Sequence, residues 1–379
     1  MAEAKEPIRV LHIIGRMDRG GIETMLMNIY RNIDRTKVQF DFLAHYGREA
    51  AYNEEIRAMG GRIYEMPALK TDDKVYYWRY FQYVQALHAF FREHREYKII
   101  HGHMTNTASI YMPIAKKYGV TCRIAHSHST KGKAGLLGKV TVLLQSSVSK
   151  WATDWFACSE AAAQWLYPRD AVKNGQVKLI SNAVDAEKFR FDPALREQIR
   201  REMDLEGKLV IGCVGRFRRE KNQGFLVRVM AELTKLREDA VLLLVGEGPF
   251  EETVKAQARE LGVEHCVRFL GMREDIHLLM QVMDMFALPS LWEGLPVVAV
   301  EAQASGLHCV ASAGVPRETD ALGGMVDFVS LEDPLDCWTQ AILKAAALPR
   351  EDTLARVRAA GFDIHTTVPW LQEFYLQRG

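Results

Sequence analysis

Residues 285–306 read MFALPSLWEGLPVVAVEAQASG, and this stretch decides the fold. It begins with four apolar residues, Met285–Leu288, which have the character of a buried strand. A loop follows, and Pro296 then suits the first turn of an apolar helix. The only charged residues of the stretch are Glu293 and Glu301, eight positions apart. We therefore predict a strand, a loop that carries Glu293 and a helix that carries Glu301, whose carboxylate needs a partner in apolar surroundings.

The same alternation of short apolar runs and longer segments of helical period extends along the whole chain in two series. The runs lie at 9–14, 38–43, 62–66, 98–101, 121–125, 154–158 and 177–181, and then at 209–214, 241–245, 267–270, 285–288, 308–311 and 325–329. This pattern is typical of parallel sheets covered by helices, so we predict an α/β chain with two doubly wound domains. We expect an N-terminal domain at 1–190, a polar linker at 191–207, a C-terminal domain at 208–362 and a last helix at 363–379 that crosses back to the first domain.

Length and composition limit the classes of function. The chain has 379 residues, of which 48% are hydrophobic and 26% charged, so it is globular and too long for a small binding module. No apolar run approaches the roughly 18–20 residues that span a bilayer. Residues 1–7 carry Glu3 and Glu6 where a signal peptide would be basic and then apolar, so we expect a cytoplasmic protein. The six cysteines form no CxxC pair, which predicts reduced core residues.

Charge is distributed unevenly along the chain. Residues 1–190 carry 28 Lys and Arg against 19 Asp and Glu, whereas the remainder carries 21 against 29. Between residues 97 and 153 there are eight basic residues and no acidic one, and Lys131, Lys133 and Lys139 lie in this window. We expect Lys131 and Lys133 to lie close to an anionic membrane surface, and we expect no nucleic-acid partner. An ordinary packed helix with solvated lysines is the alternative.

Two loops that follow predicted strands carry groups suited to phosphate. Gly20 and Gly21 precede an apolar-periodic helix, whose first N–H groups could bind an anion; a tight turn is the alternative. Arg216 and Lys221, five positions apart, could clamp a diphosphate, unless they only form a solvated charged loop. The GxGxxG spacing of dinucleotide-binding proteins is absent from both this first glycine pair and the loop at Gly246, which argues against hydride transfer.

Histidines end two neighbouring strands of the first series. They are His101 and His103 after one strand and His126 and His128 after the next. Such histidines can bind a metal, but no carboxylate or thiolate lies nearby in the sequence to complete the ligand set. We therefore expect polar lining that hydrogen-bonds a polyhydroxyl substrate, and no metal site.

Five segments in a fixed order resemble those of a known family. They are SNAVDAEKF at 181–189, GRFRREKN at 215–222, VGEGP at 245–249, RFLGMREDI at 268–276 and EGLPVVAVE at 293–301. The chain resembles the retaining glycosyltransferases of family 4, and most of all the capsule and exopolysaccharide members. That resemblance implies the GT-B fold, in which two Rossmann-like domains face each other across a cleft. One departure is Ala183, where the family often has glycine, so the turn there is expected to differ slightly.

The resemblance also implies an activity and a set of site residues. The activity is the metal-independent transfer of a hexose or N-acetylhexosamine from a nucleotide-diphosphate sugar, most commonly a UDP-sugar, to a glycan or lipid-linked acceptor. Glu293 would hold hydroxyls of the donor sugar, Glu301 the ribose, and His128 or His126 would lie at the transferred sugar. The other implied residues are Gly20, Gly21, Arg216 and Lys221 at the phosphates, Leu270, Gly271 and Met272 at the base, Gly246, Gly294 and Leu295 in the donor loops, and His101, His103, Lys131 and Lys133 on the acceptor side.

Two alternatives remain open from the sequence. A GT-B nucleotide-sugar epimerase would share the donor residues and release its product without an acceptor. A two-lobed solute-binding protein would share the architecture, but it would need an export signal that residues 1–7 do not provide. No cofactor is expected, because the nucleotide-sugar is a substrate and the sequence contains no DxD metal-binding motif.

Overall fold

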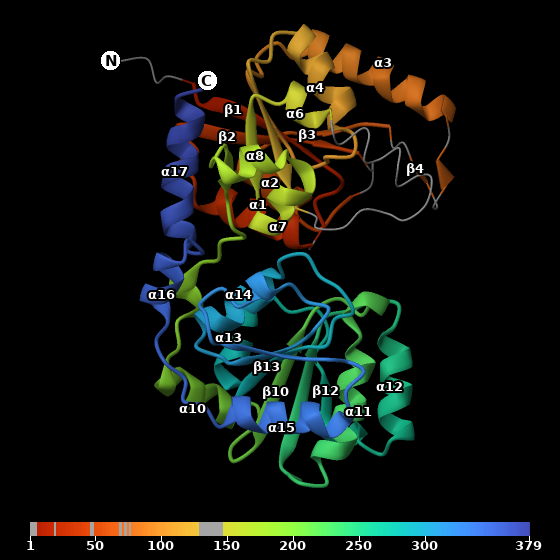
Figure 1. Cartoon of the computed structure of the whole chain (residues 1–379), viewed down its shortest axis with the longest axis vertical. Helices are drawn as coiled ribbons and strands as arrows, with labels where there is room; N and C mark the ends of the chain where they lie inside the picture. Colours follow the sequence, from red (N-terminus) through yellow and green to blue (C-terminus); the bar gives the residue numbers. More distant parts are fainter. Residues whose placement is uncertain are drawn as a thin grey trace. The chain divides into compact units, whose positions relative to one another are not determined.

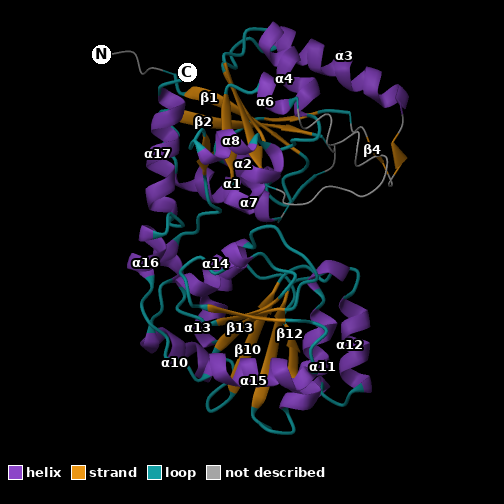
Figure 2. Ribbon diagram, viewed as in Figure 1, coloured by secondary structure: helices purple, strands orange, loops and turns teal. Residues whose placement is uncertain are grey.

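The computed structural model describes residues 6–18, 20–45, 49–67, 70–71, 74–75, 77–128 and 147–379. The chain forms two compact units: unit 1 comprises Met1–Ala183 and Ile364–Gly379, and unit 2 comprises Val184–Asp363 (Figure 1). Each unit contains a parallel sheet with helices on both faces, so the predicted α/β class is confirmed (Figure 2). The predicted acceptor-side residues Lys131 and Lys133, and Lys139, lie outside the described residues.

The sheet of unit 1 has seven strands in the order β3-β2-β1-β6-β7-β8-β9. Its strands are β1 (Ile8–Ile14), β2 (Val38–Ala44), β3 (Ile63–Glu65), β6 (Ile99–Gly102), β7 (Cys122–Ser127), β8 (Asp154–Ala157) and β9 (Val177–Leu179). A separate antiparallel pair is formed by β4 (Lys70–Thr71) and β5 (Lys74–Val75). Every residue of β2 is buried, as expected for a parallel strand covered on both faces.

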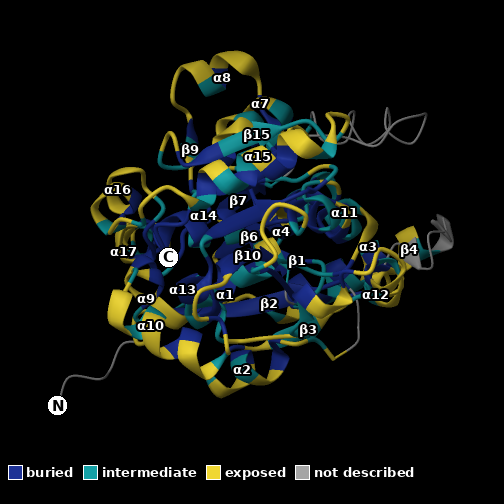
Figure 3. Cartoon of the chain, turned by 90° about the horizontal axis from the view of Figure 1, so that it is seen from below, coloured by how far each residue is buried: buried dark blue, intermediate teal, exposed yellow. Residues whose placement is uncertain are grey.

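The helices of unit 1 divide between the two faces of this sheet. They are α1 (Gly21–Asn32), α2 (Asn53–Ala58), α3 (Tyr77–Glu93), α4 (Ala108–Lys117), α6 (Val148–Trp151), α7 (Glu160–Leu166), α8 (Arg169–Lys173) and α17 (Ile364–Leu376). Helices α1, α2 and α17 contribute to one hydrophobic core, and α3, α4, α6 and α7 to the other. The last helix of the sequence thus belongs to the unit that contains the first strand. Figure 3 shows the buried sheets beneath helices whose outer sides are exposed.

Unit 2 repeats this architecture with six strands in the order β12-β11-β10-β13-β14-β15. The strands are β10 (Leu209–Val214), β11 (Ala240–Val245), β12 (Val267–Phe269), β13 (Met285–Leu288), β14 (Cys309–Ser312) and β15 (Val326–Val329). The helices are α9 (Ala186–Phe189), α10 (Pro193–Glu202), α11 (Gln223–Leu233), α12 (Glu251–Glu260), α13 (Ile276–Val282), α14 (Val297–Ala304), α15 (Leu335–Ala346) and α16 (Leu354–Ala359), with short 3-10 turns η1 (Arg219–Lys221), η2 (Glu264–Cys266) and η3 (Arg317–Thr319). Each predicted apolar run forms a strand of one of the two sheets.

The predicted linker at 191–207 is wrong, because most of this segment is a structured part of unit 2. It contains α10, whose N-terminus is capped by Asp192 through hydrogen bonds from two backbone N–H groups. Arg196 donates a hydrogen bond of 2.5 Å to Asp284, and Arg200 donates to the same carboxylate at 3.3 Å. Two of the charges that make the segment look solvated in the sequence, Arg196 and Arg200, are therefore partners of Asp284, which lies just before β13. Among the described residues, no helix combines the length and the apolar character needed to cross a bilayer.

Candidate active site

Four loops of unit 2 lie side by side at the carboxyl ends of its central strands. They follow β11, β10, β13 and β14, which are neighbours in the sheet, and this edge is where doubly wound domains bind ligands. Hydrogen bonds join the loops to one another: Phe217 N–H to Glu247 O at 3.0 Å, Leu291 N–H to Glu220 O at 2.8 Å, Asn222 Nδ2 to Pro289 O at 3.1 Å, and Ser312 Oγ to Ser290 O. The loops therefore form one connected surface.

The loops after β10 and β13 bring Lys221 and Glu293 into direct contact. Lys221 Nζ donates a hydrogen bond of 2.5 Å to Glu293 Oε1, and Ser290 Oγ donates to the same oxygen at 2.8 Å. The side chains of Glu293 and Lys221 are 12% and 25% exposed. Glu293 Oε2 has no hydrogen-bond partner among the described residues, so this oxygen can accept from a ligand hydroxyl. The family resemblance implies a sugar role for Glu293 and a diphosphate role for Lys221, and the structure places the two residues in one ion pair.

The loop after β10 also presents Arg216. Its backbone is held by Gln223, whose side-chain amide donates to the carbonyls of Gly215 at 3.1 Å and Arg216 at 3.0 Å. Asn222 turns the chain into α11 with a left-handed φ of +54°. The half-buried guanidinium of Arg216 makes no hydrogen bond or ion pair with any residue that the structure describes. It is therefore a cation available to an anionic ligand.

Glycine at 246 is required by close packing of two loops. Gly246 has φ +132°, and a Cβ there would lie 2.3 Å from the carbonyl oxygen of Gly215. A Cβ on Gly248 would lie 2.4 Å from the carbonyl oxygen of Phe217. The VGEGP segment thus allows the loop after β11 to lie directly against the loop that presents Arg216.

The residues predicted at the base, Leu270, Gly271 and Met272, follow β12, the next strand along this edge of the sheet. Gly271 has φ +62°, and its carbonyl accepts a 2.8 Å hydrogen bond from the N–H of Gly246. Leu270 packs against the core of unit 2, whereas Met272 is 44% exposed. Met272 therefore presents an apolar side chain beside the Gly246 loop.

Glu301 lies within α14, the helix that follows the Glu293 loop and the predicted donor-loop residues Gly294 and Leu295. Its side chain is half-buried and makes no hydrogen bond with a described residue. Burial raises the pKa of Glu301 to about 7, and the charge of Lys188 on α9 acts in the opposite direction. A carboxylate without hydrogen bonds in such surroundings is stabilised by donors from a ligand, and ribose hydroxyls would provide them.

Unit 1 presents the other predicted residues. Gly20 is the N-cap residue of α1, and Gly21 is its first residue. His101, His103, His126 and His128 lie together at the ends of β6 and β7, and His12 on β1 joins them. His12 was missed because it lies inside an apolar run, although the register places it opposite His101. His126 is only 1% exposed, whereas His128 is half-buried, so His128 alone of this pair is accessible to a ligand.

Comparison with known proteins identifies the family. Residues 196–323 match the model of glycosyl transferases group 1, and residues 19–188 match that of glycosyltransferase family 4. The chain is 35% identical over 377 residues to the Bacillus subtilis (strain 168) protein named as glycosyltransferase EpsF, covering 97% of this chain and 96% of that one. The chain belongs to the family 4 glycosyltransferases. It is therefore a transferase enzyme, and the predicted family is confirmed.

Other relatives of this glycosyltransferase support the same assignment. An Escherichia coli enzyme named UDP-Gal:alpha-D-GlcNAc-diphosphoundecaprenol alpha-1,3-galactosyltransferase is 29% identical over 228 residues, covering 57% of this chain and 58% of that one. The crystal structure of Anabaena HepE in complex with UDP matches with a TM-score of 0.76 at 18% identity, covering 97% of this chain and 99% of that one. WaaG, described as a glycosyltransferase of lipopolysaccharide biosynthesis, matches with a TM-score of 0.67 at 15% identity over 97% and 99% of the two chains. These structures confirm the predicted GT-B fold.

Proposed function

We propose that this glycosyltransferase moves a hexose or N-acetylhexosamine from a UDP-sugar to a glycan or lipid-linked acceptor, with retention of configuration and without a metal ion. The observation that carries the proposal is the edge of the unit 2 sheet, where the Lys221–Glu293 pair and Arg216, whose guanidinium has no partner among the described residues, lie on connected loops. Such an edge offers cations to a diphosphate and a carboxylate oxygen to sugar hydroxyls. The product belongs to cell-surface polysaccharide or glycolipid synthesis.

The names of related proteins support the choice of donor and acceptor. The Escherichia coli relative is named for UDP-Gal and for a diphosphoundecaprenol-linked acceptor. Two structures with the same fold contain UDP or UDP-glucose. A UDP-sugar and a lipid-linked acceptor are therefore the first substrates to test.

The chemistry of the transfer explains why cations matter at this edge. When the bond between the anomeric carbon and the phosphate oxygen breaks, its electrons leave with the diphosphate, and the sugar gains oxocarbenium character. Arg216 and Lys221 stabilise the departing charge, and the N-terminus of α14 adds a favourable dipole. A phosphate oxygen then accepts the proton of the acceptor hydroxyl, which attacks the same face of the sugar. No step in this scheme requires a divalent ion.

The Lys221–Glu293 pair couples the two halves of the donor. As the diphosphate binds, Lys221 shares its charge between the phosphate and Glu293 Oε1, while Glu293 Oε2 accepts from a sugar hydroxyl. Glu301 accepts from the ribose. One ion pair thus links recognition of the leaving group to recognition of the sugar that is transferred.

The configuration of the product tests this proposal. The full-length enzyme is incubated with UDP-sugars and an undecaprenyl-diphosphate-linked acceptor, and the anomeric configuration is determined by NMR. We expect the configuration of the donor to be kept, and the rate after chelation not to rise when Mg²⁺ or Mn²⁺ is added. An inverted product, a rate restored by these ions, or conversion of the nucleotide-sugar to its epimer without an acceptor would contradict the proposal.

We also propose that the enzyme works in the cytoplasm, attached peripherally to the inner face of the plasma membrane. The exposed Lys116, Lys117 and Lys150 lie in the acid-free window, and anionic lipid attracts each such residue by about 1 kcal/mol. Vesicles with anionic lipid are expected to sediment the enzyme at low salt, and Lys131→Glu, Lys133→Glu and Lys139→Glu together to release it. Equal sedimentation with neutral and anionic vesicles, or undiminished sedimentation of the triple variant, would refute attachment through the segment that contains these three lysines.

A further inference from the structure

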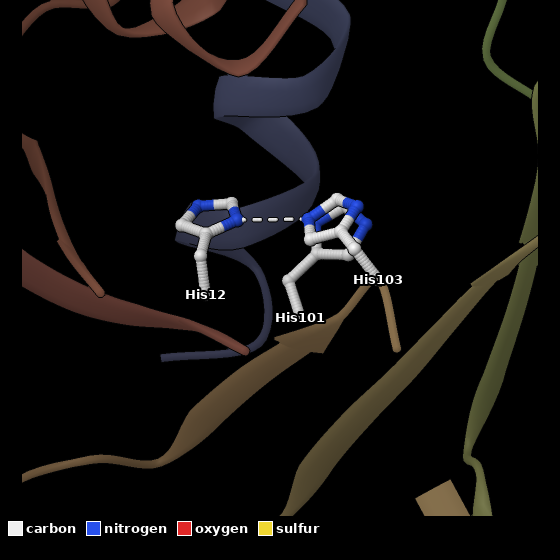
Figure 4. A group of neighbouring side chains, drawn as sticks. All are labelled: His12, His101 and His103. Atoms are coloured by element: carbon white, nitrogen blue, oxygen red, sulfur yellow. Dashed lines mark hydrogen bonds between the residues drawn. The ribbon is translucent and has the colours of Figure 1, made fainter. Parts of the chain in front are cut away.

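Five histidine rings of unit 1 lie against one another at the carboxyl ends of three adjacent strands. They are His12 on β1, His101 and His103 at the end of β6, and His126 and His128 at the end of β7. The first four are buried or nearly so, with His103 at 7% and His12 at 0% exposure. Figure 4 shows His12 facing His101 and His103. Among the described residues, no carboxylate or thiol belongs to either of the groups that these side chains form.

Two hydrogen-bonded chains run through the cluster. In the first, His12 Nδ1 lies 3.2 Å from His103 Nε2, and His103 Nδ1 lies 2.9 Å from His128 Nε2. In the second, His101 Nδ1 lies 2.7 Å from the hydroxyl of Tyr375 on α17, and His101 Nε2 lies 3.1 Å from His126 Nδ1. Three further ring nitrogens, His12 Nε2, His126 Nε2 and His128 Nδ1, are buried without a hydrogen-bond partner in the part of the chain that the structure describes. Buried ring nitrogens without a hydrogen-bond partner are costly and call for an explanation.

We propose that His12, His101 and His103 form a binding site for one divalent transition-metal ion of the zinc class. Each of the three offers a ring nitrogen, and these nitrogens all lie within 4.8 Å of one another. The 3.2 Å between His12 Nδ1 and His103 Nε2 is close to the ~3.3 Å that separates two nitrogen ligands around a tetrahedral zinc with bonds of about 2.0 Å. Three histidines also leave a coordination position open for water or another ligand.

The hydrogen bonds that surround this triad suit a metal site. If His12 Nδ1 and His103 Nε2 offer lone pairs, their protons lie on the opposite nitrogens, and His103 Nδ1–H then donates to His128 Nε2. His101 has a partner on either nitrogen, because Tyr375 lies on one side and His126 on the other. Metal-binding histidines commonly donate their second N–H to such a partner, which fixes the orientation of the ring. Metal binding therefore keeps the His103–His128 hydrogen bond and one of the two hydrogen bonds of His101, and it replaces the His12–His103 hydrogen bond.

The donor set also determines which ions fit. Neutral imidazoles suit Zn²⁺, Cu²⁺ and Ni²⁺, whereas Mg²⁺ and Ca²⁺ require oxygen ligands. Burial keeps the imidazoles neutral, since it lowers the pKa of His12 to about 3. The three ligands belong to unit 1, and none of them is a residue assigned to the diphosphate, so the site goes beyond the proposed function. It departs from the sequence-based expectation of no metal site, which was formed without His12.

Metal titration of the full-length enzyme tests the proposal. The protein, without a polyhistidine tag and treated with a chelator, is titrated with Zn²⁺ by calorimetry and with Co²⁺ by visible absorption. We expect one ion per chain and the absorption of nitrogen-ligated Co²⁺. His12→Gln and His103→Gln should each weaken Zn²⁺ binding by at least about 100-fold, since even partners of ligands contribute ~10–100-fold. His265→Gln, at an exposed histidine of η2, should leave it unchanged.

Three results would overturn the proposal. The first is a wild-type enzyme that binds no Zn²⁺ in a one-to-one ratio, which needs no variant at all. The second is unchanged affinity in His12→Gln, with its fold verified by circular dichroism; if that variant does not fold, His101→Gln takes its place. The third is loss of binding in His128→Gln together with normal binding in His12→Gln, which would assign the metal to His103, His126 and His128 instead.

Discussion

Replacing Glu301 by glutamine should change how the stability of the enzyme depends on pH. The carboxyl group lies in α14 without a hydrogen bond to any described residue, and burial raises its pKa from the ordinary value of 4.5 to about 7. A folded-state pKa above the unfolded value means that the folded enzyme holds this proton more tightly than the unfolded chain does. Ionisation of Glu301 therefore destabilises the fold. This cost is absent below about pH 4.5, grows as the pH rises, and is complete above about pH 7.

The size of the effect follows from the shift. One pKa unit corresponds to 1.36 kcal/mol, so a shift from 4.5 to about 7 costs the ionised enzyme about 3 kcal/mol of unfolding free energy. Glutamine has nearly the same shape and no charge. Relative to Glu301→Gln, the wild type should therefore lose about 3 kcal/mol of stability between about pH 4.5 and about pH 8.

Urea unfolding at a series of pH values measures this difference directly. The matched control is Glu260→Gln, which removes a carboxylate from the exposed end of α12 in the same unit. The control should show the same pH profile as the wild type, whereas the stability of Glu301→Gln should rise relative to the wild type by about 3 kcal/mol across this range. Parallel profiles for the wild type and Glu301→Gln would refute the claim that burial raises the pKa of the Glu301 carboxyl group in α14.

Two further predictions concern the same edge of unit 2. Glu293→Gln should lower turnover by about 100-fold, as measured by initial rates, and full activity in this variant would remove Glu293 from the site. UDP affinity, measured by calorimetry, should stay equal or rise, because Lys221 loses its carboxylate partner and keeps its charge. Gly246→Ala should cost about 3 kcal/mol of unfolding free energy, because the new Cβ meets the Gly215 carbonyl in a left-handed backbone. Gly262→Ala, with φ +70° and open space, should cost only the ~1–2 kcal/mol of backbone strain, and equal losses in the two variants would show that loop contact is unimportant.

The strands could be predicted from the sequence because parallel strands covered on both faces are continuous apolar runs. The positions of Arg216 and Glu293 followed from the same rule, since each lies in a loop after such a run. The Lys221–Glu293 pair could not be predicted, because the two residues are 72 positions apart and only the adjacency of β10 and β13 brings them together. His12 was not predicted for a related reason, because its polar neighbours His101 and His103 come from the end of β6. The linker at 191–207 was predicted wrongly for the opposite reason. Arg196 and Arg200 pair with Asp284 within the fold, but in the sequence they look like the charges of a solvated segment.

Calorimetric titration with UDP tests whether Arg216 and Lys221 recognise the diphosphate. The control is the double variant Arg218→Ala, Arg219→Ala, at exposed neighbours in the same loop. Charged hydrogen bonds contribute about 1.5–3 kcal/mol each, so Arg216→Ala with Lys221→Ala should weaken UDP binding by at least about 100-fold. The control variant should bind UDP as the wild type does. Wild-type affinity in the Arg216, Lys221 double variant would contradict the account.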